Sequence, residues 1–142
     1  MLRRLLLSLA VVAFSAVAAP AFASDIYVTV DISEQKMIVH MDGQMLHEFA
    51  VSTGRKGYST PTGAYGVTRM HRKYFSKKYD NAPMPHSIFF YGGYAIHGTT
   101  DIKRLGRIAS HGCVRLHPDN ARTLFNLVKE VGSGNTRIRV KA

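Results

Sequence analysis

The chain has 142 residues, of which 46% are hydrophobic and 20% are charged, and it carries 19 Lys and Arg against 9 Asp and Glu. The apolar residues suffice for a buried core, which excludes a mainly disordered protein. The length predicts one domain and excludes a second catalytic domain, a repeat array or a protein with several membrane spans.

Residues 1–23 have the pattern of a secretory signal peptide. A basic start precedes an apolar run over residues 5–19, and Ala21-Phe22-Ala23 matches a small-x-small cleavage site. The run is shorter than the roughly 20 residues of a membrane span. We therefore expect an exported protein of the periplasm or cell wall, with its domain at 24–142 and no integral membrane span after cleavage.

The formal charge of +10 indicates which partners the protein could bind. A basic exported protein meets anionic neighbours such as wall polymers and membrane surfaces, whereas plain solubility is the simpler explanation. Nucleic acid is the usual partner of such a charge, but export argues against it, so we expect no nucleic-acid partner.

The first half of the expected domain has the two-residue periodicity of strands. Asp42-Gly43 marks a tight turn, which makes the second and third strands a hairpin. Residues 55–63 contain Gly and Pro and are expected to form a loop. The predicted strands are 26–32, 36–41, 44–52 and 64–70.

Residues 71–87 interleave basic and aromatic side chains and lack a clean period, so we expect a long loop. Long loops in small domains are often functional, although a solvated surface excursion is the simpler alternative. Our hypothesis is that this segment forms a lid or a wall of a binding site.

The last third of the chain predicts two more strands, a helix and a closing strand. Residues 88–91 and 94–96 are apolar and flank a Gly-Gly turn, and 136–140 alternates again. Residues 118–131 have an apolar face at helical spacing, with Pro at the start and Gly after the end. The predicted fold is therefore mostly β, with one main α-helix near the C-terminus.

Cys113 is the only cysteine of the chain. Cysteines of exported proteins usually occur in pairs, so an unpaired one is either a reactive thiol or a buried, inert one. Rapid alkylation at neutral pH would distinguish a thiolate from a buried thiol.

The residues around Cys113 favour a reactive thiol. A cysteine nucleophile needs a base and backbone N–H groups that stabilise an oxyanion. His97 and His111 precede Cys113 by 16 and two residues, and Gly112 permits the unusual backbone angles of an oxyanion hole. A core role remains the simpler alternative for His97.

Three alternatives fit parts of this pattern. Zinc could bind His97, His111, Cys113 and His117, but structural zinc sites prefer paired cysteines at short spacing, so we expect no metal and no cofactor. A papain-like peptidase has its cysteine before its histidines, and here only His117 follows. A peptidoglycan-binding module with an inert site is the non-enzymatic alternative.

The sequence resembles the L,D-transpeptidase catalytic domain, the YkuD family. The motifs that carry the resemblance are Ile96-His97-Gly98-Thr99 and Ser110-His111-Gly112-Cys113-Val114-Arg115. Val51-Ser52-Thr53-Gly54 and Thr60-Pro61-Thr62-Gly63 support it, and it extends over about residues 26–140. The resemblance implies a mixed β-sandwich and an enzyme acting on the tetrapeptide stems of peptidoglycan.

The resemblance also implies roles for individual residues. Cys113 would attack the carbonyl of the third stem residue, release D-alanine and form a thioester, which an amine then attacks. His97 would be the general base, while Ser110 and His111 would orient the site. Backbone N–H groups near Gly112 and Cys113 would form the oxyanion hole.

The resemblance further implies the substrate-binding residues. Arg115 would bind a substrate carboxylate, with a structural salt bridge as the alternative. The remaining expected positions are Gly98, Thr99 and Tyr91. The resemblance also implies acylation of Cys113 by carbapenems.

The sequence leaves the group that accepts the acyl chain open. A stem amine would give a cross-link, water a carboxypeptidase and a D-amino acid an exchange reaction. If an outer-membrane protein were the acceptor, the reaction would tether that partner to the wall.

Overall fold

The computed structural model describes residues 18–19 and 22–142 of the chain. Most of the expected signal peptide at 1–23 lies outside the described residues, so the prediction for that segment stays a prediction. Within the described part of the chain, no helix is long and apolar enough to cross a membrane.

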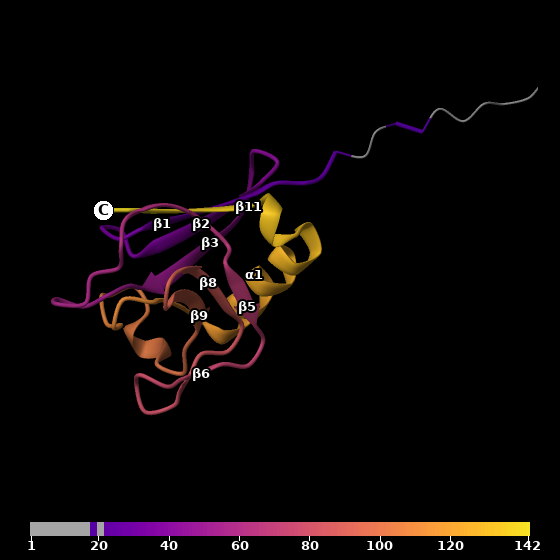
Figure 1. Ribbon diagram of the computed structural model, residues 1–142. Coiled ribbons are helices and arrows are strands. Elements are labelled where there is room, and N and C mark those ends of the chain that lie inside the picture. The colour runs from indigo at the N-terminus through magenta and orange to yellow at the C-terminus, as the bar shows by residue number, and fades with distance from the viewer. Residues whose placement is uncertain (1–17, 20–21) are drawn as a thin grey trace, which may run out of the picture.

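A mixed sheet of nine strands is the main structural feature of the described chain (Figure 1). Its order is β4-β11-β1-β2-β3-β10-β9-β8-β5. The strands are β1 (Ile26–Asp31), β2 (Lys36–Met41), β3 (Gln44–Ser52), β4 (Gly63–Gly66), β5 (Arg69–His71), β8 (Ser87–Tyr91), β9 (Tyr94–Gly98), β10 (Val114–Leu116) and β11 (Thr136–Lys141).

The long strand β3 joins two halves of this sheet. Six of its residues between Gln44 and Ala50 pair with β2, with a register shift that skips Leu46, while Val51 and Ser52 pair with β10. Only Val67 and Thr68 separate β4 from β5, which lie at the two edges of the sheet, so the sheet is curled. One apolar core is shared by both halves, because residues of β1, β3, β9 and β11 belong to the same buried cluster.

The helix α1 (Pro118–Val131) packs beside β8 and β9 (Figure 1). Its buried residues Ala121, Leu124, Phe125 and Val128 follow the helical spacing of its apolar face. The His117 side chain caps the helix by accepting a hydrogen bond from the backbone N–H of Asp119 (3.2 Å). The mostly β fold with one C-terminal helix is therefore confirmed, and the helix has the predicted bounds.

One sequence-based expectation about strands is wrong, and one strand was missed. The predicted strand 64–70 is two strands, because Val67 and Thr68 carry the chain from one sheet edge to the other. The strand β10 was not expected, because three residues are too few to show a period.

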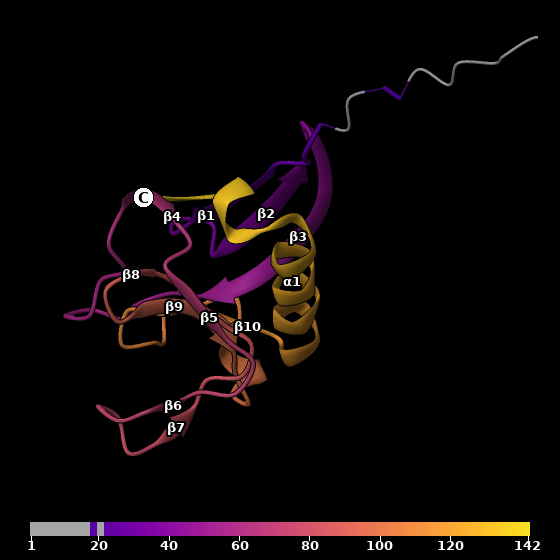
Figure 2. The ribbon, with the colours of Figure 1, turned by 45° about the vertical axis from the view of Figure 1, so that its right-hand side comes forward.

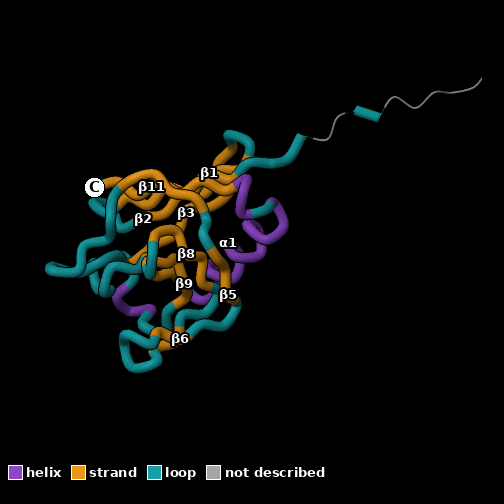
Figure 3. The backbone as a smooth tube through the Cα atoms, viewed as in Figure 1, coloured by secondary structure: helices purple, strands orange, loops and turns teal. Residues whose placement is uncertain are grey.

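The predicted long loop 71–87 contains a small hairpin of β6 (Phe75–Ser76) and β7 (Ala82–Pro83). Asp80 and Asn81 occupy its turn with positive φ angles of 49° and 52°. The hairpin projects from the sheet at the end opposite β1 (Figure 2). Most loop backbone gathers at this same end (Figure 3), which also holds the 3₁₀ turn η1 (Ile102–Arg104), whereas η2 (Ser133–Asn135) follows α1.

Candidate active site

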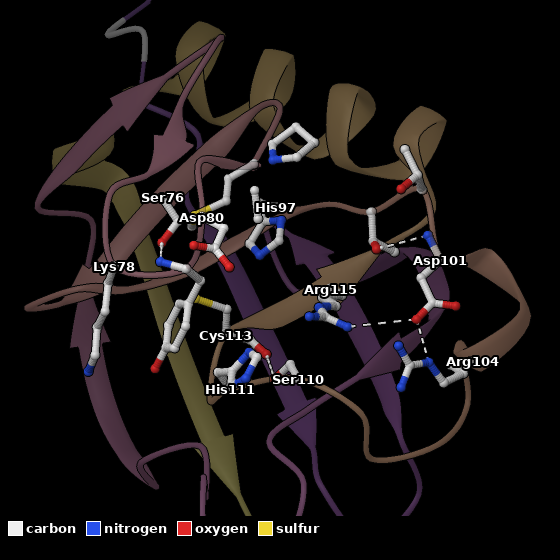
Figure 4. Close-up of a pocket in the computed structure, with 16 residues that line it drawn as sticks. Ser76, Lys78, Asp80, His97, Asp101, Arg104, Ser110, His111, Cys113 and Arg115 are labelled. Atoms are coloured by element: carbon white, nitrogen blue, oxygen red, sulfur yellow. Dashed lines mark hydrogen bonds and ion pairs between the residues drawn. The ribbon is translucent and has the colours of Figure 1, made fainter.

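A cavity of about 460 Å³ surrounds Cys113 (Figure 4). The β6–β7 hairpin forms one wall, and the opposite wall comes from β9, β10 and residues 99–104. Cys113, His97, His111, Ser110, Arg115 and Thr99 all line it. The fold therefore brings together most of the site residues expected from the two sequence motifs.

The register of β9 and β10 explains why the two motifs meet. The strands run parallel, with Val114 opposite Ile96 and Arg115 opposite His97. Side chains alternate between the faces of a sheet, so Cys113 and Arg115 share one face. His97 lies on the neighbouring strand β9, opposite Arg115. It is therefore displaced by two residues along the sheet from the level of Cys113.

Burial keeps the Cys113 thiol protonated. It raises the pKa of the thiol above its usual value, against the opposing effects of an Ala95 backbone hydrogen bond and the positive charge of Arg115. The Sγ atom lies 3.9 Å from the carbonyl oxygen of Gly93, to which it donates a weak hydrogen bond. The nucleophile therefore needs a base that removes its proton during the reaction.

His97 has the protonation state of such a base. Burial lowers its pKa to about 4, opposed by its hydrogen bond to Gly98, so the imidazole is neutral at pH 7. Its Nδ1 lies 2.7 Å from the Gly98 carbonyl oxygen, which can only accept, so Nδ1 carries the proton. The Nε2 lone pair is therefore available to accept a proton in the cavity (Figure 4).

The turn before Cys113 is held by side-chain hydrogen bonds. The Ser110 hydroxyl donates to the Cys113 carbonyl oxygen (2.6 Å) and accepts from the Gly112 backbone N–H (3.0 Å). The Thr60 hydroxyl donates to the Gly112 carbonyl oxygen (2.8 Å). Gly112 has a φ of 116°, and a Cβ there would lie 2.5 Å from the Tyr94 ring. Glycine is therefore required at this position.

These hydrogen bonds limit which backbone N–H groups could form the expected oxyanion hole. The Gly112 N–H is occupied by Ser110, so it is not free to bind an oxyanion. The backbone N–H groups of His111 and Cys113 have no acceptor within the described part of the chain. They are the better candidates for stabilising negative charge beside the thiol.

His111 belongs to an aromatic and basic cluster beside the thiol. Its ring stacks on Tyr79 at 4.2 Å and meets the edge of Tyr58 at 4.9 Å. Its Nε2 accepts a hydrogen bond from the Arg55 guanidinium (3.0 Å). Burial and the charges of Arg55, Arg115 and Lys78 lower its pKa, which keeps the ring neutral.

Arg115 carries a positive charge that is only partly balanced. Its Nη1 lies 3.9 Å from the Asp101 carboxylate, which Arg104 contacts more closely. The Arg115 side chain is 20% exposed and lines the cavity. Arg115 therefore makes the salt bridge that was the alternative, although the ion pair is long and shared, and the expected carboxylate-binding role stays a prediction.

Two expected substrate-binding residues lie elsewhere. Gly98 is buried against Pro118 and Ala121 at the start of α1, and it contributes the carbonyl oxygen that orients His97. Tyr91 packs against Tyr65 and is absent from the residues that line the cavities at Cys113. Neither Gly98 nor Tyr91 lines the cavities at Cys113, and their contact with substrate stays a prediction.

A second cavity of about 330 Å³ also reaches Cys113. Gly57, Tyr58 and Tyr94 line it, and the two cavities share Lys78, Tyr79, His111 and Cys113. The stacked rings of Tyr79 and His111 thus lie between two spaces that meet at the thiol.

Several residues of the site carried no recognisable signal in the sequence. Thr60 and Tyr94 shape the turn at Gly112, and Arg55 and Tyr79 hold His111. Their roles depend on contacts between distant segments, although the Thr60-Pro61-Thr62-Gly63 motif and the basic-aromatic pattern of 71–87 marked their neighbourhoods. Across residues 18–19 and 22–142, no three His, Cys, Asp or Glu side chains are grouped as a metal site would require.

Comparisons with known proteins agree with this geometry. Residues 25–140 match the family model YkuD, described as the L,D-transpeptidase catalytic domain. The Bacillus subtilis (strain 168) protein named "Putative L,D-transpeptidase YqjB" is 29% identical over 117 residues, covering 73% of this chain and 66% of that protein. The chain thus spans a little less than two thirds of this relative.

Solved structures show the same fold. The L,D-transpeptidase from Stackebrandtia nassauensis is 27% identical, with a TM-score of 0.73, covering 92% of this chain and 60% of that chain. The L,D-transpeptidase LdtMt1 in complex with imipenem is 23% identical, with a TM-score of 0.73, covering 83% and 59%.

Proposed function

Because this chain belongs to the YkuD family of L,D-transpeptidase catalytic domains, we propose that it is a cysteine acyltransferase acting on the tetrapeptide stems of peptidoglycan. The observation that carries this proposal is the pairing of a protonated thiol at Cys113 with a neutral imidazole at His97 in one cavity. Nucleophile, base and backbone donors together form a site for acyl transfer.

The first half of the reaction forms a thioester. His97 Nε2 takes the thiol proton while the sulfur attacks the carbonyl carbon of the third stem residue. The oxyanion is stabilised by the backbone N–H groups of Cys113 and His111. The C–N bond to the terminal D-alanine then breaks, and His97 gives the proton to the leaving amine.

The second half of the reaction transfers the acyl group to an amine. The amine nitrogen attacks the thioester carbonyl, the C–S bond breaks, and the proton lost by nitrogen returns to sulfur through His97. With an amine of a neighbouring stem, the product is a cross-link between two third residues.

Arg115 suits the carboxylate of the leaving D-alanine. A guanidinium binds a carboxylate with two hydrogen bonds, and Arg115 lies on the same sheet face as Cys113. The hairpin within residues 71–87 forms the wall opposite Arg115, which supports a role in enclosing the stem peptide.

Incubation of the purified chain with a disaccharide-tetrapeptide, followed by mass spectrometry, tests the proposal. Loss of D-alanine with formation of a dimer is the expected result. Loss of D-alanine without a dimer would indicate a carboxypeptidase or a missing protein partner, such as an outer-membrane protein. An unchanged tetrapeptide, with folded protein and a free thiol, would contradict the proposal in favour of an inert binding module.

Two variants assign the chemistry to its residues. Cys113→Ala is expected to abolish turnover with little change in folding, and His97→Ala to lower activity by on the order of 10²–10⁴. Imipenem should add its mass once to the native chain and not to Cys113→Ala. Full activity of either variant would refute the assigned roles.

Export to the periplasm or cell wall is the second part of the proposal. The basic and apolar pattern of residues 1–23 supports it. N-terminal sequencing of the protein after cell fractionation tests it, with Ser24 expected as the first residue. A cytoplasmic protein that begins at residue 1 would contradict export.

A further inference from the structure

The turn of the β6–β7 hairpin places a carboxylate in the catalytic cavity. The Tyr79 carbonyl oxygen accepts a hydrogen bond from the Ala82 N–H (2.9 Å), and the two residues between them have positive φ angles. These are features of a type I′ turn. Of those two central residues, Asp80 lines the cavity and Asn81 does not. Figure 4 shows the Asp80 carboxyl group pointing into the cavity on the side where His97 lies.

Asp80 differs in charge from the groups around it. Lys78, Arg104 and Arg115 line the same cavity and are cationic, and the other carboxylate, Asp101, is bound by the two arginines. Among residues 18–19 and 22–142, no Lys, Arg or His nitrogen lies within ion-pairing distance of Asp80. The cavity therefore offers cations that bind carboxylates and one unpaired carboxylate that would bind a cation.

We propose that Asp80 binds the ammonium group of the amine that attacks the thioester, which makes amines better acyl acceptors than water. This inference rests on the proposed function and names the class of its second substrate. An ionised carboxylate only accepts hydrogen bonds, and its bond to an ammonium group is charge-assisted. Binding beside His97 would hold the nitrogen near the base that must remove its proton.

Transfer of the acyl group to the bound amine conserves atoms and charge. The bound ammonium group loses one proton to solvent, and the free amine attacks the thioester carbonyl. A C–N bond forms and the C–S bond to Cys113 breaks. The second nitrogen proton passes through His97 Nε2 to the sulfur, so an amide, a thiol and one released proton result.

The turn itself offers a competing explanation for Asp80. Asp and Asn both adopt positive φ angles readily and are common in type I′ turns. Asp80→Asn keeps the turn and the side-chain shape and removes only the charge. Asn81→Asp is the matched control, since it adds a carboxylate at the adjacent turn position, which does not line the cavity. The double variant moves the charge by one residue at constant net charge.

The experiment measures how the acyl-enzyme divides between an amine and water. The full chain is incubated with a tetrapeptide whose own amines are acetylated, together with glycinamide or hydroxylamine, and the products are quantified by mass spectrometry. Glycinamide is mainly cationic at pH 7, whereas hydroxylamine is mainly neutral. Intact-protein mass spectrometry follows the thioester in the same samples.

Asp80→Asn is expected to lower the ratio of glycinamide transfer to hydrolysis about tenfold, as for the loss of one charged hydrogen bond. The ratio for hydroxylamine should stay near the native value, and Asn81→Asp should behave as the native chain in both. The double variant should resemble Asp80→Asn.

Three results would overturn the inference. In Asp80→Asn, the ratio of glycinamide transfer to hydrolysis could be unchanged. The ratios for glycinamide and for hydroxylamine could also fall together, and that result would indicate a structural role for Asp80. Asp80→Asn could also form no thioester, and the carboxylate would then act before the amine arrives. A native chain that forms no thioester would instead contradict the proposed function, and the inference with it.

Discussion

Cys113 and His97 are uncharged partners in the free protein, not a thiolate–imidazolium pair. Burial raises the pKa of the thiol and lowers that of the imidazole, so the neutral pair is favoured from both sides. The Cys113–His97 pair therefore carries no charge before substrate binds. Proton transfer from sulfur to Nε2 must accompany substrate binding, and fast alkylation at neutral pH is therefore not required of an active enzyme.

His97 should make the protein less stable in mild acid. Its pKa is 6.5 when exposed and about 4 in the folded state. The unfolded chain therefore binds more protons between these pH values, and the free energy of unfolding falls as pH falls through this range. We expect a loss of about 3 kcal/mol between pH 7 and pH 4 from this residue.

Urea unfolding at several pH values measures this effect. His97→Gln should have a flatter pH dependence than the native chain. Equal slopes for His97→Gln and the native chain would contradict the buried, neutral imidazole.

Gly112→Ala should damage the turn that presents the thiol. An alanine there would combine a positive φ with a Cβ 2.5 Å from the Tyr94 ring. We expect a loss of about 1–3 kcal/mol in stability and at least tenfold in turnover. Thermal unfolding and D-alanine release measure the two effects.

Gly134→Ala is the matched control, because a Cβ at Gly134 meets no atom within 4 Å. It should leave both quantities near the native values. Native turnover in Gly112→Ala would show that the turn tolerates a different backbone path.

At the scale of elements, the β6–β7 hairpin contributes much of the catalytic cavity. Lys78, Tyr79 and Asp80 come from the hairpin, and the Tyr79 ring stacks on His111 beside the thiol. The hairpin pairs with no strand of the main sheet, since β6 bonds only to β7 among the described strands. Its position therefore depends on contacts such as the Tyr79–His111 stack.

Tyr79→Ala should weaken peptide binding. Loss of an aromatic stack costs about 0.5–1.5 kcal/mol, which corresponds to roughly a two- to thirteenfold rise in KM for the tetrapeptide. Steady-state kinetics of D-alanine release measure this change. Tyr27→Ala, on the exposed face of β1, is the control with native KM. A native KM for Tyr79→Ala would remove the hairpin from substrate binding.

The elements also show how far sequence reasoning reaches. The helix 118–131 was predicted with its bounds, because its apolar face, Pro118 and Gly132 are all local signals. That Cys113 and His97 meet in one cavity was predictable, because the two motifs that carry the family resemblance contain them. In contrast, Thr60, Arg55 and Tyr94 act through contacts between distant segments, and no local pattern marks those contacts.

At the scale of the whole molecule, β11 is the last described strand in the sequence and lies beside the first one. It pairs in parallel with β1 and antiparallel with β4. Ile138 and Val140 of β11 are buried in the same core as Val114 beside the thiol. The catalytic half and the β11 half of the sheet should therefore unfold as one unit.

Removal of residues 136–142 should abolish folding. It separates β4 from β1 and exposes the core that β11 covers. Circular dichroism and thermal unfolding should show no cooperative transition, whereas removal of Ala142 alone should leave the transition intact. A folded, active chain without β11 would show that the catalytic half is independent.

The place of β11 also has a consequence for biosynthesis. β1 leaves the ribosome first among the described strands, and its parallel neighbour β11 leaves last, so the sheet stays incomplete until residues 136–141 have been synthesised. Contacts between such distant segments also slow folding. A chain threaded across a membrane from its N-terminus would reach the far side with its thiol already delivered but its cavity not yet assembled. The cavity at Cys113 would then assemble only after residues 136–141 had arrived.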